Sequence, residues 1–216
     1  MVLLTSELHE IAGKAERIFA RHGLACCLTG GVACQLYGTT RAPNDVDLVV
    51  LTTRYSQEHI KQILIDADSQ FYLVPSKDPY ATYKVLWYRL GSYAGRCKVD
   101  VLQPGIMNIP NVPIQHIETI KGLPVMPLTL LLFMKLQAWT DHRDSSKHYM
   151  RSKQYTDLVD ISKLLDIAVE RGEVMGHSAK WMPEEFVRSA VGRMKEHITL
   201  LPDAKAKQWR IIGYKS

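Results

Sequence analysis

Two aspartates separated by one residue, Asp45 and Asp47, directly precede the apolar run Leu-Val-Val. Side chains at positions i and i+2 of a β-strand point to the same face, so a strand here would project both carboxylates together. Adjacent carboxylates repel and raise each other's pKa unless a cation lies between them. This pair of acids therefore favours a clamp for Mg²⁺.

A third acid, Asp100, interrupts another apolar strand-like run, Lys-Val-Asp-Val-Leu. If the two strands are neighbours, three carboxylates converge on one or two metals, the arrangement that stabilises the attacking and leaving oxygens in nucleotidyl transfer. The ordinary alternative is that Asp45 caps a turn and that Asp100 pairs with Arg96 or Lys98. That alternative suits a single acid better than it suits all three together.

A Gly30-Gly31 pair precedes the two aspartates by fourteen residues and lies between a predicted strand and a predicted helix. Glycines let the backbone approach a ligand closely, and a helix start offers free N–H groups to phosphate oxygens. The surrounding residues, Thr-Gly-Gly-Val-Ala-Cys, match neither the dinucleotide-binding GxGxxG spacing nor a Walker loop. A Gly-Gly pair alone is a weak signal for phosphate binding, and the two aspartates that follow it make that signal strong.

Hydrophobic periodicity and turn residues predict the elements that must position these groups. We expect an α/β or α+β fold, with a mixed sheet, flanking helices and a helical C-terminal part. The predicted domains are residues 1–124 and 125–216. The predicted helices are 5–21, 31–38, 55–67 (capped by Ser56), 127–141, 151–171 and 183–199, and the predicted strands are 24–29, 45–52, 71–75, 83–90 and 97–104. The polar stretch 141–153 is expected to be a loop or a mobile connection.

The composition, 46% hydrophobic and 23% charged, is that of an ordinary globular protein. Pro127 and Lys135 break the most apolar run, which is expected to be a buried helix rather than a membrane span. The N-terminus lacks the features of a signal peptide, and no CxxC pair occurs among the four cysteines. We expect reduced, mostly buried thiols, a cytoplasmic or nuclear location and no membrane partner.

The charge of +5 is uneven, because the residues from Pro127 onward hold 15 Lys and Arg against 11 Asp and Glu. A basic helical half suits a phosphate-bearing partner such as RNA, or it is simply a solvated surface. Trp139, Tyr149 and Tyr155 are candidates to stack a base, although the helical spacing of Trp139 fits a core position equally well.

The three motifs together resemble a known superfamily. Gly30-Gly31, Asp45-Val-Asp47 and Val99-Asp100-Val101 are similar to the signature of the nucleotidyltransferases, which have the fold of DNA polymerase β. This resemblance covers about Leu24 to Leu102. Further segments resemble the AbiEii-type branch, known from bacterial abortive-infection toxins: Arg41-Ala-Pro-Asn-Asp45, Lys135-Leu-Gln-Ala and Lys153-Gln-Tyr-Thr-Asp157-Leu158.

The resemblance implies roles for these residues. Asp45 and Asp47 would hold the Mg²⁺ or Mn²⁺ that carries a nucleoside triphosphate, and Asp100 would join them on the metal that activates an acceptor hydroxyl. The triphosphate would rest on Gly30-Gly31, with Lys135 as a point charge. In the family, a serine after the first glycine often contacts a phosphate. This chain has Gly31 at that position, so the contact is either missing or comes from Thr29. Arg41 either touches phosphate or pairs with one of the acids.

The implied activity is a metal-dependent nucleotidyltransferase that moves a nucleoside monophosphate to an acceptor hydroxyl, on an RNA or tRNA end, a protein or a small molecule. Two alternatives stand beside it: a non-catalytic relative that binds nucleotide or RNA, and an interaction module of the toxin–antitoxin kind. The acceptor, the base preference and the oligomeric state are not encoded in these motifs.

Overall fold

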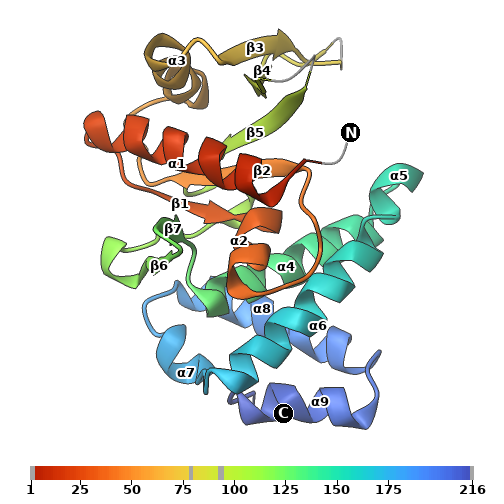
Figure 1. Cartoon of the computed structure of the whole chain (residues 1–216). Coiled ribbons are helices and arrows are strands. Elements are labelled where there is room, and N and C mark those ends of the chain that lie inside the picture. Colours follow the sequence, from red (N-terminus) through yellow and green to blue (C-terminus); the bar gives the residue numbers. More distant parts are fainter. Residues whose placement is uncertain (1–2, 78–79, 92–94, 215–216) are drawn as a thin grey trace. The chain divides into compact units, whose positions relative to one another are not determined.

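The computed structural model describes residues 3–77, 80–91 and 95–214 (Figure 1). The chain divides into two compact units. The first comprises Met1–Leu36 and Thr40–Met126, and the second comprises Tyr37–Thr39 and Pro127–Ser216. That residues 1–124 and 125–216 are separate domains, each able to fold by itself, stays a prediction.

The first unit is built on one mixed sheet of seven strands in the described part of the chain. The strand order is β3-β4-β5-β2-β1-β7-β6. β2 pairs with β5 in parallel, as β1 does with β7, and the other neighbours are antiparallel. The strands are β1 (Cys26–Thr29), β2 (Asp45–Val50), β3 (Phe71–Pro75), β4 (Lys84–Arg89), β5 (Arg96–Leu102), β6 (Glu118–Ile120) and β7 (Leu123–Val125).

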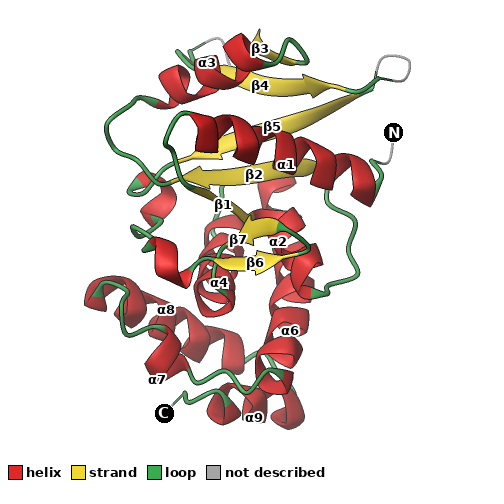
Figure 2. Cartoon of the chain, turned by 60° about the vertical axis from the view of Figure 1, so that its left-hand side comes forward, coloured by secondary structure: helices red, strands yellow, loops and turns green. Residues whose placement is uncertain are grey.

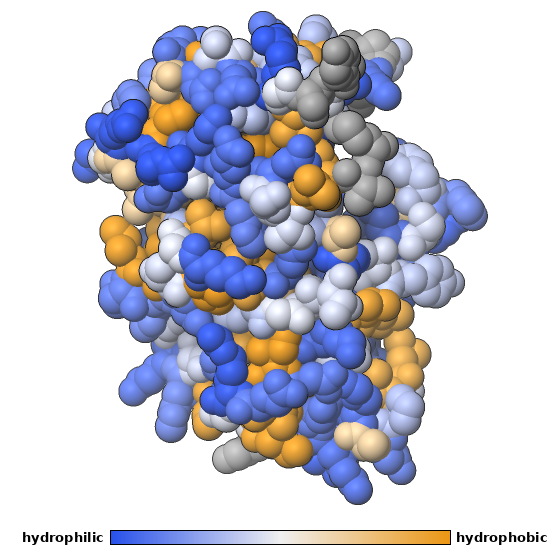
Figure 3. Space-filling model, viewed as in Figure 1, coloured by the Kyte–Doolittle hydropathy of each residue, from blue (hydrophilic) through white to orange (hydrophobic). Residues whose placement is uncertain are grey.

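Two helices cover one face of this sheet, α1 (Thr5–Arg21) and α3 (Gln57–Ala67), as Figure 2 shows. α1 buries one stripe that includes Leu8, Ile11 and Ile18, and the outward sides of α1 and α3 in Figure 3 are mostly hydrophilic. The predicted cap of α3 is confirmed, because the Ser56 hydroxyl accepts a hydrogen bond from the backbone N–H of His59.

Between β1 and β2 lies α2 (Gly30–Tyr37), and two short 3₁₀ turns (Ile106–Asn108 and Ile114–His116) connect β5 to β6. The helix α2 begins at the residue that directly follows β1. The two glycines therefore lie at the junction of a strand and a helix, as the sequence predicts.

The second unit is helical, with α4 at its centre in contact with α5, α6 and α8, and with α9 packed on α6. Its helices are α4 (Leu128–Arg143), α5 (His148–Arg151), α6 (Gln154–Glu170), α7 (Met175–Ser178), α8 (Glu184–Ile198) and α9 (Asp203–Ile211). Trp139 is fully buried in this core, where its ring meets the edge of His197, which in turn meets Trp209. Trp139 is therefore a core residue and no base platform, whereas Tyr149 and Tyr155 are exposed.

The mixed sheet with flanking helices and a helical C-terminal part is confirmed. The expectation of a continuous loop over residues 141–153 was wrong, because α4 runs on to Arg143 and α5 forms within that stretch. Arg143 stabilises the end of α4: its guanidinium lies over the ring of Trp139 and pairs with Asp144 and Glu196. The sequence-based prediction also missed β6, β7, α7 and α9.

The four cysteines are buried and free, as expected. In the described ranges, none of the helices has both the length and the apolar character needed to cross a bilayer.

Candidate active site

The three predicted acids lie together on one face of the sheet in the first unit. Parallel pairing of β2 with β5 places Asp47 opposite Asp100, with Asp45 two residues earlier on the same face. One carboxylate oxygen from each residue lies within 4.8 Å of the other two, and all three residues are partly buried. Three hard oxygen donors that converge on one face of two neighbouring strands fit a divalent cation such as Mg²⁺.

A cation of the chain itself, Lys98, already stands in this cluster. Its Nζ lies 2.5 Å from Oδ2 of Asp100, and its register partner in β2 is Asp45. Burial lowers the pKa of Lys98, but the hydrogen bond to Asp100 and the charges of the three aspartates outweigh this effect and raise the pKa. The predicted pairing of Asp100 with Lys98 is therefore real, and it exists within the carboxylate cluster rather than in place of it.

Gly30 is required by the position of Asp47. Its φ is +62°, a conformation that L side chains rarely adopt, and a Cβ at this position would lie 2.0 Å from Oδ2 of Asp47. The backbone at the start of α2 thus approaches a candidate metal ligand more closely than any side chain would permit.

Gly31 is packed for a different reason. A Cβ there would lie 2.9 Å from Nη2 of Arg41 and 2.9 Å from Cβ of Pro43. The Arg41 guanidinium therefore lies against the Gly30-Gly31 turn, which places a positive charge next to the predicted phosphate site. Thr29, the register partner of Asp47, is buried, and its hydroxyl donates a weak hydrogen bond to the sulfur of Met126.

Lys135 belongs to the second unit, where it is buried in α4. Its Nζ lies 2.8 Å from Oδ2 of Asp160 and 3.5 Å from Oδ1 of Asp157, and Asp157 also contacts Nδ1 of His142 at 2.6 Å. Asp157 is thus a buried ion-pair partner rather than a surface acid. The role of Lys135 as a phosphate contact stays a prediction.

The sequence-based reading did not assign Lys98 to the site. The signal was present, because Lys98 precedes Asp100 by two residues and a strand puts such residues on one face. Strand pairing, which brings Lys98 beside Asp45, was the missing information.

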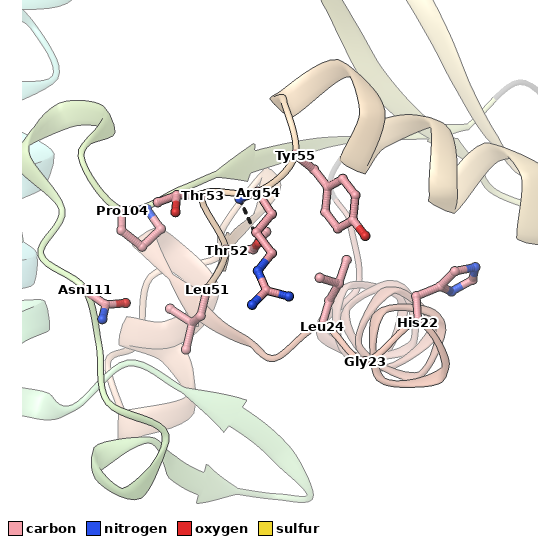
Figure 4. A pocket seen from close by; sticks show the side chains of 10 residues that line it. All are labelled: His22, Gly23, Leu24, Leu51, Thr52, Thr53, Arg54, Tyr55, Pro104 and Asn111. Carbon is pink, nitrogen blue, oxygen red and sulfur yellow. Dashed lines mark hydrogen bonds between the residues drawn. The ribbon is translucent and has the colours of Figure 1, made fainter.

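A pocket of about 620 Å³ lies elsewhere in the first unit (Figure 4). Its lining comes from residues before β1, after β2 and after β5, with the Arg54 side chain extending between Leu24 and Leu51. It therefore lies at the opposite ends of these strands from Asp45 and Asp47. Among the described residues, no carboxylate lines this pocket, so we place the candidate active site at the aspartates.

Comparisons with known proteins bear on the family and the fold of this chain. The family model "Nucleotidyl transferase AbiEii toxin, Type IV TA system" matches residues 16–208. An antigenic nucleotidyltransferase-like protein from Paracoccidioides brasiliensis has a similar crystal structure, with a TM-score of 0.63 and 17% identity over 94% of this chain and 93% of that one. The antibiotic-resistance factor ANT(2'')-Ia matches with a TM-score of 0.48 and 12% identity over 92% of this chain and 100% of that one.

The search of curated proteins found no match. The family model nevertheless spans most of the sequence, including the three aspartates and both glycines. The chain belongs to the AbiEii nucleotidyltransferase family.

Proposed function

We propose that this protein is a metal-dependent nucleotidyltransferase that moves a nucleoside monophosphate from an NTP to an acceptor hydroxyl. The observation that carries the proposal is the convergence of three carboxylates from two parallel strands beside a side-chain-free turn. A non-catalytic relative would have no need to keep all three acids so close together, since their mutual repulsion is costly.

Each part of the site has a separate task in this reaction. The N–H groups of the Gly30-Gly31 turn, with Arg41 beside them, bind and orient the triphosphate. Asp45, Asp47 and Asp100 hold Mg²⁺ or Mn²⁺, which when bound supplies the charge that neutralises the phosphates and lowers the pKa of the hydroxyl. Thr29 and Lys135 are the remaining candidates for phosphate contact.

The acceptor oxygen forms a bond to the α-phosphorus while the bond from that phosphorus to the β-bridging oxygen breaks. Pyrophosphate leaves, and the proton of the acceptor hydroxyl passes to solvent water. The protein contributes mainly positioning and charge, because an in-line displacement at phosphorus requires little covalent chemistry from protein side chains. We propose a cytoplasmic or nuclear location, where NTPs and Mg²⁺ are available.

Position-specific labels test the proposal. The protein is incubated with Mg²⁺ and each NTP labelled at the α- or the γ-phosphate, together with total RNA or total cell protein. We expect the α-label to join an acceptor and the γ-label to leave as pyrophosphate, with no transfer in excess chelator or by Asp47→Asn. Transfer of the γ-label would identify a kinase instead. Absence of α-label transfer from all four NTPs to both acceptor pools would favour an interaction module of the toxin–antitoxin kind.

A further inference from the structure

A row of side chains crosses the sheet from its edge to the carboxylates. The strand register pairs Tyr72 of β3 with Trp87 of β4, Trp87 with Lys98 of β5, and Lys98 with Asp45 of β2. Directly paired residues share a face, so these four side chains lie on the face of the sheet that bears the candidate active site. Tyr72, Trp87 and Lys98 are all partly exposed.

Two arginines extend this row, and each lies over an aromatic ring. The guanidinium of Arg96 is 4.4 Å from the ring centroid of Trp87, and that of Arg89 is 5.1 Å from the ring of Tyr72. Both arginines are exposed. Within residues 3–77, 80–91 and 95–214, neither guanidinium forms an ion pair with a carboxylate. We call Tyr72, Trp87, Arg89 and Arg96 the aromatic–arginine surface.

The opposite face of the same strands has a different character. Leu86, Tyr88 and Val99 point to that side and are buried in the core, and α1 and α3 pack on it. The two arginines that lie over aromatic rings are thus on the same side of the sheet as the three aspartates, whereas Phe71, Tyr88 and Lys84 are on the other side.

The direction of the proposed reaction indicates what this face can bind. An in-line displacement places the acceptor opposite the leaving pyrophosphate. The Gly30-Gly31 turn follows β1, whereas β5 lies on the other side of β2 and is followed by β4 and β3. If the triphosphate lies at the glycines, the acceptor approaches over β5 and its remaining length passes over β4 and β3. Trp87 is two strand spacings, about 10 Å, from β2.

We propose that the aromatic–arginine surface binds the acceptor and that this acceptor is the single-stranded end of a nucleic acid. The inference rests on the proposed function for its direction. Guanidinium groups attract phosphates, and exposed rings of Trp and Tyr stack bases. A polycationic small molecule would be repelled by Arg89, Arg96 and Lys98, and a neutral acceptor would leave the guanidinium groups uncompensated.

Binding of a fluorescently labelled single-stranded RNA of about twelve nucleotides, within the range of such sites, tests this by polarisation without NTP or metal. Arg89→Ala with Arg96→Ala should weaken binding about tenfold or more and reduce the slope of log affinity against log salt by about 1 to 1.5. Trp87→Ala should weaken binding about tenfold with an unchanged slope, and Trp87→Phe should restore most of it.

Lys84→Ala is the matched control, because Lys84 is an exposed cation of the same strand on the opposite face. Its RNA affinity should stay within about twofold of the unchanged protein, since its charge faces away from the surface. The proposal is overturned if the unchanged protein does not bind the RNA at low salt, or if Lys84→Ala weakens binding as much as the arginine variants do.

Label transfer separates this inference from the proposed function. Transfer to cell protein that is undiminished in Trp87→Ala would overturn the inference and leave the nucleotidyltransferase intact. RNA binding that depends on Trp87 and both arginines, with no label transferred from any NTP, would refute the proposed reaction while the binding surface stands.

Discussion

Gly30→Ala is the sharpest test of the candidate active site, because one methyl group is added next to one carboxylate. The new Cβ would lie 2.0 Å from Oδ2 of Asp47, whereas ordinary contacts begin at 3.4 Å, so the carboxylate must move by about 1.4 Å. Mg²⁺ requires its oxygen ligands close to 2.0–2.1 Å. A displacement of this size removes Asp47 from any ligand set that it shares with Asp45 and Asp100.

The substitution also costs stability, since alanine at positive φ is strained by about 1–2 kcal/mol. In a chain of this size, that strain lowers the melting temperature by about 2–8 °C. Gly23→Ala separates the two effects. Gly23 has a similar φ, +69°, but nothing lies within 4 Å of the position of its Cβ. It should show the same strain with the site intact.

Calorimetry with NTP, in Mg²⁺ and in excess chelator, is the assay. In Mg²⁺, Gly30→Ala should bind triphosphate at least tenfold more weakly, about 1.4 kcal/mol, while Gly23→Ala binds as the unchanged protein does. The reasoning is refuted if Gly30→Ala folds, loses only the stability that Gly23→Ala loses, and retains full metal-dependent affinity.

Three further substitutions probe single groups. Asp100→Asn should lower the single-turnover transfer rate by about a hundredfold with NTP affinity nearly unchanged, since its charge acts mainly in the transition state; normal turnover would remove it from the mechanism. Lys135→Met should lower the free energy of unfolding in urea by about 3–5 kcal/mol, because it leaves Asp160 buried without its cation. A loss below about 1 kcal/mol would contradict a structural role for this pair. Burial lowers the pKa of His197 to about 4. The free energy of unfolding should therefore be highest above about pH 6.5 and fall by up to about 3 kcal/mol as the pH drops towards 4. The reason is that His197 binds a proton in the unfolded chain over this range but not in the folded chain. His197→Phe should reduce this loss in urea titrations at pH 7.5 and 4.5.

The elements around the aspartates were predictable because each carries a local signal. The stripe of α1, the Ser56 cap and the alternation of Asp45 and Asp47 are all short-range patterns. β6 and β7 carry no such signal, since each has three residues and β7 contains Pro124. β7 belongs to the sheet through its pairing with Leu28 of β1, a contact between residues far apart in the sequence.

Long-range pairing also decided which side chains meet at the site. That β5 lies beside β2, and in this register, could not be read from either segment alone. The prediction that Asp100 joins the pair was conditional on it. The aromatic–arginine surface could not be predicted for the same reason, because its members come from three strands, β3, β4 and β5, whose registers set the row.

Lys98 explains how the chain tolerates the cluster that it builds. Two unit charges 4.8 Å apart repel by roughly 3 kcal/mol at an effective dielectric constant near 20, before further screening by solvent. Three carboxylates within that distance of one another therefore oppose folding unless they are compensated. The ammonium of Lys98, in contact with Asp100 and paired in register with Asp45, offsets one of the three negative charges. A lysine two residues before Asp100 thus lowers the repulsion among the three carboxylates of the first unit.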